Sequence, residues 1–147
     1  MTYAEKAKAN FLNGCNCAQA VFLAFADEQM DRDTAMRLAA GLGGGMAGMR
    51  GICGAVTGMF LAYGLLRGSN DPTDQERKKD CYETLRRLAG EFEQREGTLS
   101  CRQLLGLDPD FTPKAPQPRT QAYYDSRPCP YLVEHAAAIL EAYLRAN

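Results

Sequence analysis

Six cysteines are the residues of this chain best suited to chemistry, because a thiolate binds thiophilic metals and also reacts with oxidants and disulfides. With one histidine and no CxxC pair, the chain has neither a His-rich metal site nor a thioredoxin-type or c-type haem motif. Reducing compartments disfavour structural disulfides, so metal binding or redox chemistry is the favoured use of these thiols. The six are Cys15, Cys17, Cys53, Cys81, Cys101 and Cys129.

Four of the cysteines share one position, at or within the first turn of a predicted helix: Cys17, Cys53, Cys101 and Cys129. The start of a helix presents free N–H groups and about half a positive charge. This environment favours a thiolate by roughly 0.3–1 kcal/mol, so we expect the pKa of each thiol to fall. If the four helix starts converge, they form a pocket for an anionic thiolate cluster.

The other two cysteines are expected to have ordinary roles. Cys81 lies on the apolar stripe of a predicted helix, which favours packing, and Cys15 is either a turn residue or a spare thiol beside Cys17. Arg50 and Arg102 stand close to Cys53 and Cys101 in the sequence, and either could stabilise a neighbouring thiolate.

The apolar periodicity is helical throughout and no segment alternates with the period of a strand, which predicts an all-α fold. We expect one domain over residues 1–147, a compact helical bundle with an irregular proline-rich loop at about 107–128. One helix should begin at Asp71-Pro72, a capping residue before a proline, and Leu38 should point inward on another. Caps included, the predicted helical segments are 4–12, 16–27, 31–42 or 33–42, 52–68, 71–97, 98–105 or 100–105, and 130–144.

The stretch Gly41–Gly68 contains ten of the 14 glycines and is predicted to supply the centre of the fold. From Ile52 to Leu66 there is no charged residue, and apolar side chains surround the helix, as in a buried helix. Gly54 and Gly58 are four positions apart, so they should let a neighbouring backbone approach closely. The run is shorter than the about 20 residues that span a membrane.

Two other sequence patterns are weaker indications of function. Residues Gly43–Gly48 spell GxGxxG, but a dinucleotide site needs a strand before the glycines and a helix is predicted there. His135, in the last predicted helix, is expected to be an ordinary surface or core histidine.

The composition describes a globular chain, 46% hydrophobic and 24% charged. Seventeen basic and 18 acidic residues give a net charge of −1, and without a basic block nucleic acid is not an expected partner. The first residues lack an apolar run of signal-peptide length, so we expect a cytoplasmic protein with no membrane insertion. The residues do not identify a redox or electron-transfer partner, and they are compatible with a homodimer.

The run Cys53-Gly54-Ala55-Val56-Thr57-Gly58 matches a CGAxxG motif, and the chain resembles the C_GCAxxG_C_C family of redox-active proteins. That family carries four characteristic cysteines, which correspond here to Cys17 in NCAQ, Cys53 in ICGAVTG, Cys101 in SCRQLLG and Cys129 in PCPYL. The resemblance implies a bacterial or archaeal redox or metal–thiolate protein, often encoded near transporter genes. A related module in split-Soret cytochromes resembles an iron–sulfur carrier. Cys15 and Cys81 lie outside the pattern.

Three functional hypotheses follow, and the residues do not decide whether the protein is an enzyme. In the first, Cys17, Cys53, Cys101 and Cys129 bind an iron–sulfur cluster or another thiophilic metal, with zinc as the alternative, and the protein transfers electrons. In the second, a metal-free thiol–disulfide enzyme or sensor uses Cys53 and Cys17 as its redox-active pair. In the third, a zinc ion staples a structural adaptor.

Overall fold

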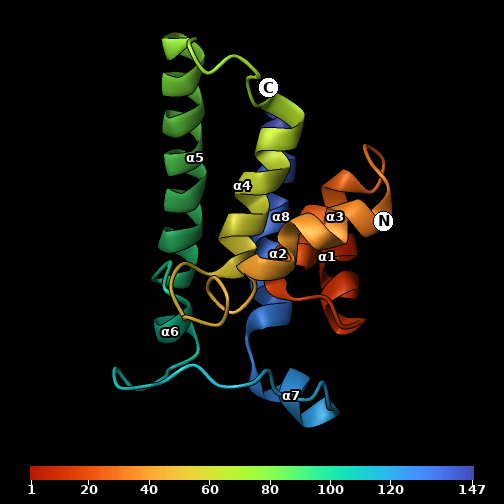
Figure 1. The fold of residues 1–147 in the computed structure, drawn as a ribbon, viewed down its shortest axis with the longest axis vertical. Helices are drawn as coiled ribbons and strands as arrows, with labels where there is room; N and C mark the ends of the chain where they lie inside the picture. The colour runs from red at the N-terminus through yellow and green to blue at the C-terminus, as the bar shows by residue number, and fades with distance from the viewer.

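The computed structural model describes residues 1–147 and confirms the all-α prediction (Figure 1). Eight α-helices and one 3₁₀ helix are present, and the only extended pairing is a single bridge between Ile52 and Ser100. The elements are α1 (Tyr3–Leu12), α2 (Cys17–Ala26), α3 (Arg32–Ala39), η1 (Ala40–Leu42), α4 (Gly54–Arg67), α5 (Gln75–Glu96), α6 (Cys101–Leu104), α7 (Gln121–Ser126) and α8 (Cys129–Ala146).

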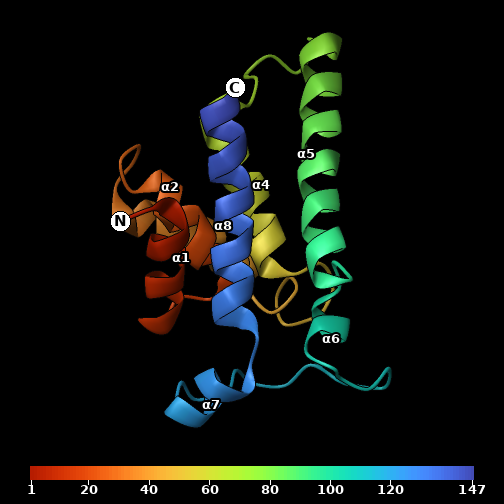
Figure 2. The same cartoon turned by 180° about the vertical axis from the view of Figure 1, so that it is seen from behind.

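Helices α2 and α4 share the centre of the bundle. All of α2 except Cys17 and Gln19 is buried, because the helix packs against α1, α3, α4 and α8. Seen from behind, α8 runs between α1 and α5 (Figure 2). None of the helices combines the length and the apolar character that a membrane span needs.

The two glycines of α4 are contact positions, as the sequence predicts. A Cβ added at Gly58 would lie 2.6 Å from the carbonyl oxygen of Ala18, and one at Gly54 would lie 3.0 Å from Cβ of Cys17. Bare glycine backbone therefore lets α4 press directly on the first turn of α2. This close approach places Cys17 beside the start of α4.

The prediction that apolar residues of α4 are buried all round holds for one face only. Leu65 is 38% exposed, and Leu38 of α3, predicted to point inward, is 55% exposed. Both line an apolar groove of about 450 Å³ in which Phe60 and Leu61 also lie, because no element covers this side of α4. Ile52 is not helical but extended, in its bridge with Ser100.

The predicted start of the long helix α5 is wrong by three residues. Asp71 does not cap it, since its carboxylate accepts hydrogen bonds from the N–H and hydroxyl of Thr73 in the preceding turn. Asp74 is the N-cap and accepts from the backbone N–H of Arg77. The Asp71-Pro72 pair forms a turn before the helix because the Asp71 side chain bonds locally to Thr73.

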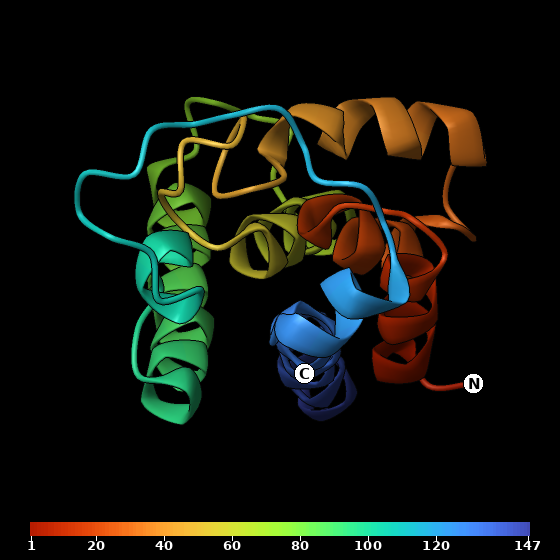
Figure 3. The same ribbon diagram turned by 90° about the horizontal axis from the view of Figure 1, so that it is seen from below.

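The segment 107–128 is irregular over most of its length, but it also contains α7, which the sequence analysis did not predict. Thr120 caps α7 by accepting from the backbone N–H of Tyr123. The segment crosses the molecule from α6 to α7 along the glycine-rich loop 43–51 (Figure 3). Arg119 fastens it to the bundle by donating to the carbonyl oxygens of Phe11 and Cys15.

Candidate thiol site

The four cysteines that the sequence places at helix starts are found there. Cys17, Cys101 and Cys129 are the first residues of α2, α6 and α8, and Cys53 is the N-cap of α4. Local sequence explains these starts, because Asn16 and Ser100 cap α2 and α6, and Pro130 stands at the second position of α8. Helices α4 and α8 begin at the lower end of the bundle in Figure 1, where α6 also lies.

A short antiparallel pairing joins Cys53 to Cys101. The N–H of Cys53 donates to the Leu99 carbonyl at 2.8 Å, and the N–H of Cys101 donates to the Gly51 carbonyl at 2.7 Å. The two cysteines are therefore diagonal neighbours across the bridge, a relation in which side chains share one face. Their thiols interact electrostatically.

Cys17 and Cys129 form the second half of the group. Their thiols interact in a way that shifts the pKa of both, and the Cys17 thiol also interacts electrostatically with Cys53 and Cys101. We call these four residues the thiol group. It assembles from four helix starts, and 112 positions of the sequence separate Cys17 from Cys129.

The remaining two cysteines lie outside the thiol group. Cys15 is buried, and its sulfur points to the thioether of Met36 at 3.8 Å. Cys81, half-buried on α5, interacts with Tyr63. Both positions are those of packing residues.

The expected fall in pKa is found at one cysteine and reversed at two. Burial raises the pKa of Cys53 to about 12, because it outweighs the lowering effect of the backbone N–H groups of Ala55 and Val56 at the helix start. The interaction with the Cys129 thiol, followed by burial, raises the pKa of Cys17. The same interaction, with the charge of Arg127, lowers the pKa of Cys129 to about 7. A helix start alone does not set thiol acidity here.

Arginines border the thiol group, and of the two that the sequence suggests, Arg50 and Arg102, only Arg50 is among them. Nη1 of Arg50 lies 3.6 Å from the sulfur of Cys101, while Arg102 instead braces the loop through the carbonyl oxygens of Asp108 and Phe111. The positive charges of Arg127 and Arg119 both act on the Cys129 thiol and favour its thiolate form.

The sequence analysis missed Arg119 and Arg127. The sequence feature that could have identified them is their position in the long proline-rich loop, on either side of Tyr123. Both guanidinium groups stack on the Tyr123 ring.

The donor set suits a thiophilic metal, although the present side-chain positions do not form a closed coordination shell. No three His, Cys, Asp or Glu side chains lie close enough together to hold one ion. Cysteine sulfurs bind zinc at about 2.3 Å, so binding requires the thiols to turn toward a common centre. The arginines offset the negative charge of such a centre, and the buried Nε of Arg50 has no hydrogen-bond partner of its own.

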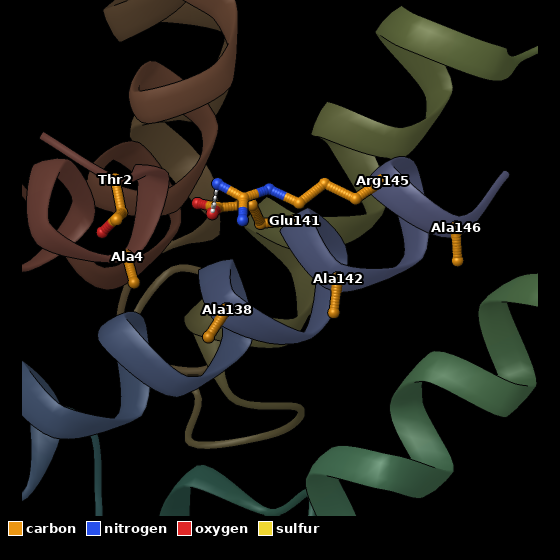
Figure 4. Close-up of a pocket in the computed structure, with 7 residues that line it drawn as sticks. All are labelled: Thr2, Ala4, Ala138, Glu141, Ala142, Arg145 and Ala146. Carbon is orange, nitrogen blue, oxygen red and sulfur yellow. Dashed lines mark ion pairs between the residues drawn. The ribbon is translucent and has the colours of Figure 1, made fainter.

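Other polar features have structural roles. The cavity of about 530 Å³ in Figure 4 lies between the start of α1 and the end of α8. Its carboxylate, Glu141, pairs with Arg145 at 2.8 Å and accepts from the N–H of Tyr3 at 2.7 Å. His135 pairs with Glu96 and ties α8 to the end of α5, the ordinary role expected of it. Residues 43–48 follow helices and not a strand, so they are no dinucleotide fingerprint.

The acidity of Cys129 gives a direct prediction. In reduced, metal-free protein, ultraviolet thiolate absorbance should rise in a first step with a midpoint near pH 7, because the pKa of Cys129 is lowered to about 7. Cys129→Ser should abolish this step, and Arg127→Gln should move it to higher pH by removing a positive charge. Cys81→Ser is the matched control and should leave it in place. A first step that survives in Cys129→Ser would contradict the assignment.

A comparison with known protein families returns one match. The family described as "Putative redox-active protein (C_GCAxxG_C_C)" matches residues 15–143, a range that contains the whole thiol group. No curated protein and no solved structure matches the chain.

Proposed function

We propose that the thiol group binds an iron–sulfur cluster, and we start from the fact that the chain belongs to the C_GCAxxG_C_C family of redox-active proteins. Zinc or another thiophilic metal is the alternative. The observation that carries the proposal is the gathering of Cys17, Cys53, Cys101 and Cys129 from four separate helix starts. A bound cluster would supply one-electron transfer.

The surroundings of the thiol group support such a role. Cys53, Cys101 and Cys129 are buried, which keeps water from a bound centre. Arg50 places its guanidinium 3.6 Å from the sulfur of Cys101, and the charge of Arg127 acts on the thiol of Cys129. Hydrogen bonds to cluster sulfurs and a positive surrounding charge favour the reduced state, so these two arginines are proposed to tune a reduction potential.

Purification without oxygen tests the proposal. We expect a brown protein that contains iron and acid-labile sulfide in equal amounts and is bleached by dithionite. A colourless protein with zinc bound by the same cysteines would support the zinc alternative. Protein that holds neither metal, even after reconstitution with iron and sulfide or with zinc, would overturn metal binding.

A second candidate function is favoured by the contact between Cys17 and Cys129, which suits a metal-free thiol–disulfide protein. The sequence analysis chose Cys53 as the partner of Cys17, whereas the stronger influence of Cys129 on the Cys17 thiol favours Cys129. Diamide removes two electrons and two protons from two thiols, so it should link Cys17 to Cys129 in the metal-free protein. Peptide mapping under non-reducing conditions identifies the linkage. A Cys17–Cys53 disulfide, or six free thiols after treatment, would contradict this expectation.

We also propose a cytoplasmic location, because a reducing compartment keeps an unoccupied thiol group from oxidising. The electron partner and the assembly state belong to the same proposal: a soluble redox partner, with a homodimer as one form of the protein.

A further inference from the structure

A small cavity of about 280 Å³ lies beside the thiol group, between the glycine-rich loop and the proline-rich loop. Four of its lining residues are cationic, and none of the 12 is acidic. We call it the arginine pocket. Its cationic residues are Arg50, Lys114, Arg119 and Arg127.

No carboxylate of the protein pairs with the cations of the arginine pocket. The five ion pairs of the structure all lie elsewhere, and none involves these four residues. The chain as a whole carries a net charge of −1, so the concentration of positive charge is local. Partly buried cations without a counter-charge are costly, which is the condition that a bound anion relieves.

Arg50 and Arg119 are held in place for such a role. Arg50 has a φ of 60°, a strained conformation for a residue with a side chain, and its buried Nε donates to nothing. Arg119 is fixed by two carbonyl oxygens and lies over the ring of Phe11 at 4.6 Å. Two preorganised guanidinium groups lose little freedom when they bind a ligand.

We propose that the arginine pocket binds one small oxyanion, with a phosphate, sulfate or carboxylate group, on the side of the thiol group where Arg127 lies. Guanidinium groups match the oxygens of these anions with paired hydrogen bonds. The volume lies just below the range of about 300–1,000 Å³ typical of sites for larger organic ligands, which favours a small anion. The arginines are half-buried and line a hollow, so an acidic protein surface would reach them poorly.

The site has a chemical consequence for the thiol group. Arg127 lines the arginine pocket and its positive charge also acts on the Cys129 thiol, so an anion bound there would partly neutralise the charge that the thiol experiences. A small anionic substrate in this position would be the direct neighbour of the redox group. Anion binding itself requires no metal, so the proposal stands apart from cluster binding.

Titration calorimetry on the reduced, metal-free protein tests the proposal at constant ionic strength. The probes are inorganic phosphate, sulfate and malonate, which separate tetrahedral anions from carboxylates. We expect saturable binding of one anion per chain for at least one probe. The double variant Arg50→Gln/Arg127→Gln should bind it at least about tenfold more weakly, the loss typical of charged hydrogen bonds.

Two further variants make the result decisive. Lys114→Gln changes an exposed side chain that takes part in none of the ion pairs of the structure, so it should leave the fold intact and weaken binding by about threefold. Arg77→Gln/Lys78→Gln removes two positive charges from the exposed start of α5 and should leave affinity unchanged. The proposal would be overturned if no probe bound saturably, or if the α5 control variant bound the anion as weakly as the double variant. Full affinity in both Lys114→Gln and a correctly folded double variant would also overturn it.

Discussion

Replacing Cys17, Cys53, Cys101 or Cys129 singly by serine is expected to remove most of the bound metal from anaerobically purified protein. A serine hydroxyl stays protonated where a cysteine gives up its proton, and soft metals prefer sulfur over oxygen ligands. Each substitution therefore takes away one of the four proposed sulfur ligands. Iron, zinc and sulfide per chain are the quantities to measure.

The two cysteines outside the thiol group are the matched controls. Cys81→Ser and Cys15→Ser should retain the metal content of the unaltered protein, because Cys81 faces Tyr63 and Cys15 faces Met36. Full metal content in any one of the four thiol-group variants would remove that cysteine from the proposed ligand set. Loss of metal in Cys81→Ser, with the fold intact, would show that the centre is built differently.

Replacing Gly58 by alanine is expected to lower the free energy of unfolding by about 1–3 kcal/mol through overpacking. The added Cβ would lie 2.6 Å from the carbonyl oxygen of Ala18, and neither backbone can rotate away from this contact as a side chain could. Helix α2 or α4 must shift instead. Because Ala18 follows Cys17 directly, the shift should also separate Cys17 from the start of α4 and weaken metal binding.

Gly64→Ala is the control for this prediction, since it makes the same change in the same helix with no neighbouring atom within 4 Å. Alanine is the better helix former, so Gly64→Ala should stabilise the protein by about 0.5–1 kcal/mol. Urea unfolding of the metal-free variants measures both values, and metal content measures the effect on the site. Equal stabilities for the two variants would show that α4 does not need bare backbone at Gly58.

The opposite pKa shifts of Cys129 and Cys53 give the two thiols different protonation states near neutral pH. Cys129 has a pKa of about 7 and is ready to bind a metal or attack as a thiolate near neutral pH. Cys53, with its pKa raised to about 12, is neutral until a metal displaces its proton. Metal binding should therefore release protons and become stronger as the pH rises.

Local signals in the sequence determined the helices and the placement of the cysteines on them. Helical periodicity is visible in a short run of residues, and capping residues such as Asn16 and Ser100 act within one turn of the helix. These features can therefore be predicted from short segments. The same holds for Gly54 and Gly58, whose spacing predicts a close helix contact without naming the neighbour. Where two local signals competed, as at Asp71 and Asp74, the prediction chose the wrong cap.

Only the tertiary structure decided which thiols touch and how acidic each one is. The contact of Cys17 with Cys129 joins positions 112 residues apart, and no short segment encodes it. Burial, which raises the pKa of Cys53, depends on every element packed around α4. The roles of Arg119 and Arg127 likewise appear only when the proline-rich loop folds back over the bundle. Desolvation and charge act through space, so the chemistry of the site is a property of the packed chain and not of its segments.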